Sequence, residues 1–178
     1  MIPPNKYDLG PSNSRLVVKT FREGLAKKIG HDLVIDVTAW KATVTVDPDP
    51  ARSSIAASAQ VASFEVREGL GGVMPLTDGD RADIKETITN KVLPFAEITF
   101  RSTTVGVSGN KATVTGELTL GGNAQPVALE LTQEGNRVRG TLTVVQTQWG
   151  IKPHTAFLGA LKVRDAVDIE VEATFPGA

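Results

Sequence analysis

The sequence predicts an all-β protein: an eight-stranded antiparallel β-barrel with one helix at about residues 78–92 and a short helical turn at about 24–29. Apolar and polar residues alternate with a period of two along most of the chain, which is typical of half-buried strands. Two of the expected strands change the parity of their apolar residues, so each must bend once. Bent strands favour a sheet that closes on itself. The chain of 178 residues is expected to form a single domain over residues 1–178, with an irregular arm over residues 1–14.

The alternation is clearest in residues 111–120, where the apolar side chains all carry even numbers, and in residues 163–175, where all of them except Ala166 carry odd numbers. Residues 125–134 and 137–147 flank a short turn that contains Gly135, which predicts a β-hairpin. Four further segments complete the expected set of eight strands: residues 15–22, 31–46, 54–67 and 96–105.

Two of these strands contain a change of parity. In residues 31–46, Leu33, Ile35 and Val37 share one face, whereas the later apolar set, from Trp40 to Val46, is even-numbered. In residues 54–67 the same change falls between Val61 and Phe64. A change of parity needs an extra residue, so we predict a β-bulge near Thr38–Ala39 in the first strand.

The helix is predicted from an i, i+4 stripe formed by Ile84, Ile88 and Val92. Aspartates crowd its start and Pro94 limits its continuation, as the helix dipole and the geometry of proline require. In the shorter turn, Leu25 and Ile29 are expected on one side, with Gly30 as the C-terminal stop.

Composition excludes several classes of protein. The formal net charge is −1, which gives no electrostatic footprint for nucleic acid. Cysteine is absent, so disulfides and thiolate metal sites are excluded. No apolar run approaches the roughly 20 residues of a transmembrane segment. The N-terminus as written has no secretory leader, which predicts a cytoplasmic protein, or a periplasmic or secreted one if a leader has been removed.

Motifs for catalysis are weak. His31 and His154 are the only imidazoles, and a zinc site usually has three or four protein ligands, so no metal site is predicted. Residues 106–110 differ from a nucleophile elbow at the final glycine, and they lie between two strands instead of between a strand and a helix. We assign no catalytic residue. His31 is interpreted as a histidine that hydrogen-bonds to backbone or touches a ligand, and a histidine-dependent enzyme remains an alternative.

The inward face combines small residues with apolar and aromatic ones. Ala57, Ala59, Ala112, Gly116 and Gly140 are small, which favours an open lumen, although a barrel filled by side chains is equally compatible with the spacing. The helix and the segment from Trp149 to Phe157 are expected to border or plug the lumen. The predicted lining is Leu33, Val37, Trp40, Ala57, Ala59, Phe64, Ile88, Phe100, Val114, Leu118, Leu129, Leu142, Trp149, Phe157 and Ile169. Such a lining suits a long apolar ligand.

Several short motifs occur in an order that resembles the YceI-like family over nearly the whole chain. They are GHDL at 30–33, LPFAEITFRS at 93–102, TGELTL at 115–120 with Pro126–Val127, WGIKP at 149–153 and LGALKV at 158–163. The resemblance implies a lipocalin-like barrel that binds a polyisoprenoid, such as a polyprenyl phosphate or an isoprenoid quinone, in its lumen. The hairpin residues 121–125, Gly-Gly-Asn-Ala-Gln, lack the cationic group common in that family.

The leading hypothesis is therefore a non-enzymatic carrier of an isoprenoid or similar long-chain lipid. It needs no cofactor apart from the bound lipid, and His31 and His154 are candidate contacts for the lipid head group. The main alternative is a stress-response or protein-interaction module with a filled barrel. An edge strand could also pair two copies into a homodimer.

Overall fold

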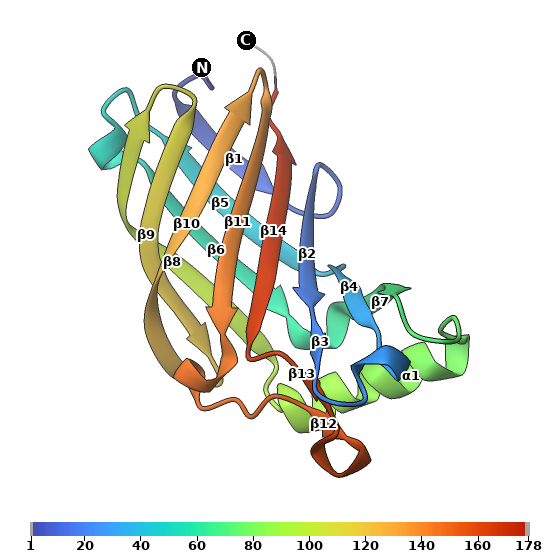
Figure 1. Cartoon of the computed structure of the whole chain (residues 1–178). Helices are drawn as coiled ribbons and strands as arrows, with labels where there is room; N and C mark the ends of the chain where they lie inside the picture. The colour runs from blue at the N-terminus through green and yellow to red at the C-terminus, as the bar shows by residue number, and fades with distance from the viewer. Residues whose placement is uncertain (1, 177–178) are drawn as a thin grey trace.

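The computed structural model describes residues 2–176, most of which belong to one large, curled antiparallel sheet (Figure 1). In spatial order its strands are β1 (Asn5–Leu9), β5 (Trp40–Val46), β6 (Ser54–Gln60), β8 (Glu97–Ser108), β9 (Lys111–Leu120), β10 (Asn123–Glu134), β11 (Arg137–Val145), β14 (Ala166–Thr174), β2 (Ser14–Thr20), β4 (Asp32–Val37) and β7 (Phe64–Leu70). A small second sheet contains β12 (Thr155–Ala156), β13 (Leu161–Val163) and β3 (Arg22–Glu23). The predicted all-β, lipocalin-like barrel is confirmed.

Two stretches of the chain each form two strands of the sheet, and this arrangement makes the sheet curl. β4 and β5 are parts of one stretch, and β6 and β7 are parts of another. β4 pairs with β2, whereas β5 pairs with β1 and β6, so the two halves of one stretch join opposite ends of the sheet. All eight predicted strands are present if β4 with β5, and β6 with β7, are each counted as one. β1 is an additional strand, so the prediction of an irregular arm over residues 1–14 is wrong for residues 5–9.

The parity changes mark corners of the barrel. The predicted bulge at Thr38–Ala39 is instead a complete break between β4 and β5. Thr38 donates from its backbone N and from Oγ1 to the Ser63 carbonyl, at 3.1 and 3.0 Å. Ser63 ends the 3-10 turn Val61–Ser63, which is the second corner, between β6 and β7. The two corners are therefore bonded to each other. Shifts of register within the strands fall elsewhere, at Val34/Ile35 and Ser102/Thr104.

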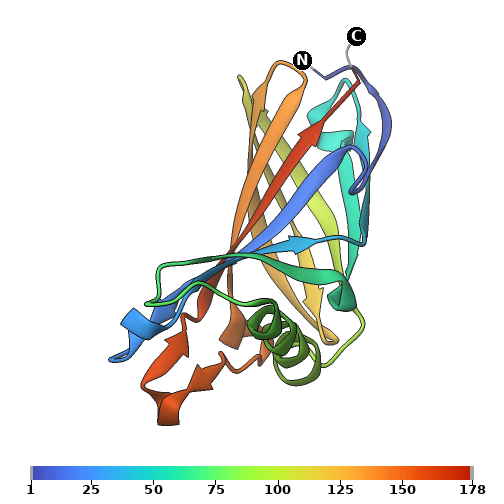
Figure 2. The same cartoon turned by 90° about the vertical axis from the view of Figure 1, so that its right-hand side faces the viewer.

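The helix lies across one end of the barrel (Figure 2). It consists of α1 (Asp78–Thr87) and a π-helical turn from Ile88 to Val92, as predicted for residues 78–92. Thr77 caps it through a reciprocal capping box with Asp80. The backbone and side-chain hydrogen bonds of Thr77 hold the pKa of the Asp80 carboxyl below its ordinary value. Ile84 and Ile88 pack against the barrel core.

The short turn is smaller than predicted. A 3-10 turn covers only Lys27–Ile29, and Gly30 follows it in an extended conformation. Leu25 and Ile29, which were expected on one side of the turn, are both exposed. No helix within residues 2–176 is long and apolar enough to cross a membrane.

Near the end of the barrel that holds the two termini, the wall has a seam without a backbone ladder. β1 pairs only with β5, and the pairing of β14 with β2 stops at Ala173 and Ser14. Beyond that point β1 meets the end of β14 through an edge-to-face contact of Tyr7 and Phe175, whose ring centroids are 5.0 Å apart. Side-chain packing, not hydrogen bonding between strands, closes the wall there.

The two ends of the barrel differ. Both termini and the turns β5–β6, β8–β9 and β10–β11 lie at one end, which we call the mouth (Figure 1). The helix and the small second sheet lie at the opposite, closed end. The buried apolar residues form two separate clusters, one around Ile35, Trp40 and Phe64 and one around Leu118, Leu142 and Trp149.

Candidate functional site

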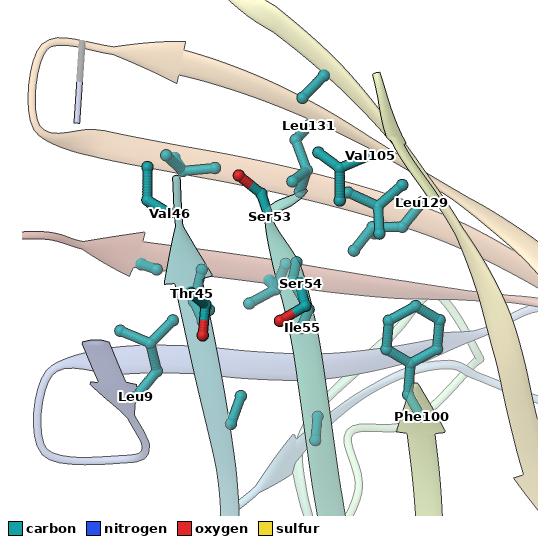
Figure 3. Close-up of a pocket in the computed structure, with 18 of the residues that line it drawn as sticks. Leu9, Thr45, Val46, Ser53, Ser54, Ile55, Phe100, Val105, Leu129 and Leu131 are labelled. Atoms are coloured by element: carbon teal, nitrogen blue, oxygen red, sulfur yellow. The ribbon is translucent and has the colours of Figure 1, made fainter. Parts of the chain in front are cut away.

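A cavity of about 380 Å³ occupies the barrel and reaches the mouth (Figure 3). Most of its wall is aliphatic or aromatic, with side chains contributed by β1, β2, β5, β6, β8, β9, β10, β11 and β14. A volume of this size lies within the range typical of pockets for small apolar ligands. The barrel is therefore not packed solid, contrary to the filled-barrel alternative.

Small inward residues were expected to leave the lumen open. The inward glycines do not do so, because neighbouring side chains fill the space beside them. A Cβ at Gly116 would lie 2.6 Å from the Phe100 ring, so the ring packs directly over this glycine. A Cβ at Gly140 would likewise meet Leu131 at 2.6 Å and Val171 at 2.8 Å. The glycines allow large neighbours to lie flat against the wall, and those neighbours form the lining of the cavity.

We predict that Gly116→Ala lowers the free energy of unfolding by about 1–3 kcal/mol, the usual cost of overpacking. The ring of Phe100 can move, but the added Cβ would also lie 2.5 Å from the carbonyl oxygen of Arg101, which is backbone. Urea denaturation measures the change. Gly106→Ala in β8 is the matched control, because the nearest atom to its Cβ is 3.9 Å away. Equal stability of the two variants would contradict this packing.

Polar groups gather at the mouth. The β5–β6 connection contributes Asp47 and Ser53, and Ser54 begins β6. The β8–β9 turn contributes Asn110, and Lys111 begins β9. The Asp47 backbone N donates to Ser53 Oγ at 3.0 Å, which fixes the loop. Hydroxyl, amide and single charged groups therefore surround the entrance to an apolar interior.

The floor of the lumen is closed by Trp149, which is 3% exposed. It ends the 3-10 turn Gln146–Trp149 and donates from Nε1 to the Leu118 carbonyl at 2.9 Å. Ile151 is buried beside it, and Val92 and Leu93 from the end of the helix pack against the same cluster. The predicted plug is therefore formed by the helix and by the first residues of the segment that begins at Trp149.

Trp40 is buried, and its indole N–H has no hydrogen-bond acceptor among the described residues. It lines the cavity, and its Nε1 is the only buried side-chain polar atom within residues 2–176 that has no hydrogen-bond partner. Buried indole N–H groups usually find a partner. This one is a donor that the protein itself leaves unpaired.

The predicted lining divides into three groups. Nine of the predicted residues line the cavity: Trp40, Ala57, Ala59, Phe100, Val114, Leu118, Leu129, Leu142 and Ile169. Five pack in the clusters beside or below it and do not line it: Leu33, Val37, Phe64, Ile88 and Trp149. Phe157 was predicted to face the lumen, and this is wrong: it is 64% exposed on a loop outside the barrel.

Neither histidine lines the cavity. His31 is half-buried at the closed end, where its Nε2 lies 2.7 Å from the Met74 carbonyl oxygen. The interpretation of His31 as a histidine bonded to backbone is confirmed. His154 is exposed next to β12. A head group held at the mouth would be at the other end of the barrel from both.

Sequence reasoning missed part of the lining. Leu131, Val138 and Val171 share the parity of predicted lining residues on their own strands, so the alternation could have found them. Ile2, Pro4 and Leu9 were missed because the arm was taken as irregular. Within the described chain, no three His, Cys, Asp or Glu side chains are grouped so that they could hold a metal ion.

An apolar lumen with a polar rim, inside a curled antiparallel sheet, defines a barrel-fold binding protein. Residues 7–175 match the family model described as YceI-like domain, and the chain belongs to this family. No curated protein matches the sequence.

Two solved structures share the fold. The chain is similar to Burkholderia cenocepacia BcnA, with 22% identity, a TM-score of 0.62 and coverage of 90% of this chain and 96% of that chain. It is also similar to the Campylobacter jejuni YCEI protein, with 15% identity, a TM-score of 0.53 and coverage of 80% and 84%.

Proposed function

We propose that the protein binds a long apolar lipid, a polyisoprenoid, in the barrel lumen and carries it without chemical change. The observation that supports this most directly is the cavity of about 380 Å³, whose lining is almost entirely apolar and which opens at one end. Burial of an apolar tail there contributes about 25 cal/mol per Å² removed from water, less the cost of ordering the chain.

The charges of the rim favour an uncharged head group, such as a quinone, over a phosphate. Lys111 is the one cationic residue of the cavity lining, and Asp47 is its one anionic residue. Asp47 is paired with Arg52 at 3.7 Å. A phosphate is usually recognised by several cationic groups or by backbone N–H groups at a helix start, whereas hydroxyl and amide groups suffice for a carbonyl.

Native mass spectrometry of the protein purified from its own host, followed by lipid extraction, tests the proposal. We expect a bound species with the mass ladder of an isoprenoid, and its head-group mass separates quinone from phosphate. The apo protein is then mixed with an isoprenoid quinone and, separately, with a polyprenyl phosphate. A clean apo mass together with no uptake of either lipid would overturn the proposal. Preferential uptake of the phosphate would overturn only the choice of head group.

A further inference from the structure

Exposed large apolar side chains are concentrated at the closed end of the barrel. Of the eight such residues within residues 2–176, only Val107 lies near the mouth. The other seven are Leu25, Ile29, Leu70, Val73, Met74, Phe157 and Leu158. They lie in three places: the β3–β4 connection, the end of β7 with the loop that follows it, and the β12–β13 connection. These lie together at the lower left of Figure 2. A concentration of exposed apolar side chains at one end of a protein indicates an interaction surface. We call these seven residues the three-loop surface.

The three loops are fixed to one another. The Ala26 backbone N donates to the Ala160 carbonyl at 2.9 Å, which ties the first loop to the third. His31 Nε2 lies 2.7 Å from the Met74 carbonyl oxygen, which ties the start of β4 to the second loop. β3 also pairs with β13 beneath the first and third loops. The surface is therefore preorganised.

The backbone at the tip of the third loop is strained, and no buried contact of the two residues there offsets the strain. Phe157 and Leu158 have φ values of 50° and 55°, and they are the only non-glycine residues in the described chain with positive φ. Bulky side chains rarely adopt this conformation, and such strain concentrates at functional sites. Here it accompanies two large apolar side chains that face solvent.

Cationic side chains surround the first and third loops. Lys27, Lys28, Lys152 and Lys162 are all exposed, and none of them takes part in an ion pair within residues 2–176. Glu23, opposite Lys162 in the β3–β13 pairing, is the nearest opposing carboxylate in the small sheet. The acidic start of α1 follows the second loop. The positive side of the surface therefore lies around Leu25, Phe157 and Leu158.

We propose that the three-loop surface docks the protein onto an anionic lipid bilayer. Leu25, Phe157 and Leu158 would enter the interface, and the four lysines would lie at the level of the lipid phosphates. Apolar tips surrounded by lysines match the pattern of peripheral membrane binding, in which apolar burial and attraction to anionic lipids act together. The β3–β4 and β12–β13 connections project as separate loops at the closed end (Figure 2), which suits a lipid surface that yields around each of them. The mouth then faces away from the bilayer.

Flotation with vesicles tests this proposal. We expect the purified protein to float with vesicles of phosphatidylcholine mixed with phosphatidylglycerol, and to float much less with pure phosphatidylcholine or at high salt, because salt screens the lysines. The double variant Phe157→Ser/Leu158→Ser should lose at least about tenfold in vesicle affinity, because two apolar side chains no longer enter the interface. Both positions are exposed, so the variant should fold, which circular dichroism verifies.

Val107→Ser is the matched control, because it removes the exposed apolar residue near the mouth, at the entrance of the cavity and away from the three-loop surface. We expect its vesicle binding to equal that of the unchanged protein. Absence of binding to the anionic vesicles would overturn the proposal, as would a double variant that binds normally. A loss with Val107→Ser as large as that of the double variant would also overturn it, because docking would then not depend on this surface. Ala57→Trp, which fills the lumen, should still float; loss of flotation in that variant would mean that the vesicles only supply lipid to the lumen.

Discussion

Ala57→Trp is expected to reduce uptake of an isoprenoid lipid by at least about 100-fold, or about 2.7 kcal/mol. Ala57 is half-buried in β6, lines the cavity and pairs with Phe100 of β8. An indole at this position would occupy the space that the ligand tail needs. The measurement is titration of the apo protein with an isoprenoid quinone, followed by intrinsic fluorescence or native mass spectrometry.

The control for this variant is Ala56→Trp. Ala56 is the preceding residue of the same strand and is exposed on the outer face, so the same substitution adds an indole outside the barrel. We expect lipid uptake close to that of the unchanged protein. If the two variants bind lipid equally well, and both retain the thermal transition of the parent, the lumen is not where the ligand binds.

Trp149→Ala is expected to lower the free energy of unfolding by about 3–5 kcal/mol, the usual effect of truncating a large buried aromatic residue. Trp149 is almost fully buried under the lumen, and it holds the Leu118 carbonyl through its Nε1. The truncated variant loses both the packing and the hydrogen bond, and the floor of the barrel loses its largest side chain. Urea denaturation gives the change in stability.

Two further variants separate the contribution of the hydrogen bond from that of the packing of Trp149. Trp149→Phe keeps most of the apolar volume but leaves the Leu118 carbonyl without this donor, so we expect a smaller loss of about 1–3 kcal/mol. Phe157→Ala removes an exposed aromatic ring from the same segment and should change stability by less than about 0.5 kcal/mol. A Trp149→Ala effect as small as that of Phe157→Ala would show that the floor does not support the barrel.

The alternation of residues could predict the strands because each has one face in the core and one in water. The alternation could also locate the corners at residues 38–39 and 61–63, but it could not show whether each is a bulge or a break in the strand. A change of parity is produced equally by a bulge and by a break, and only the partners of each half decide between them. β1 escaped notice because its alternation rests on Tyr7 and Leu9 alone, in a strand of five residues.

The candidate site was predictable in part for the same reason. Parity shows which side chains point inward, and nine of the predicted residues do line the cavity. It does not show which inward side chains meet: Phe100 covers Gly116, whereas Val37 and Phe64 pack below the open space. Phe157 lies in a loop, where no period applies, and its exposed position depends on a backbone conformation that sequence spacing does not reveal.

The seam between β1 and β14 is the place where we expect the circumference of the barrel to change most easily. Between paired strands, widening the wall would break several ladder hydrogen bonds. At the seam it would disturb side-chain packing that includes one edge-to-face aromatic pair, worth about 0.5–1.5 kcal/mol beyond area burial. We therefore expect the wall to widen more easily near the mouth than where β2 pairs with β4. If the lumen holds an isoprenoid, as proposed, it should discriminate by polarity more than by size, and tails of different bulk should fit one lumen.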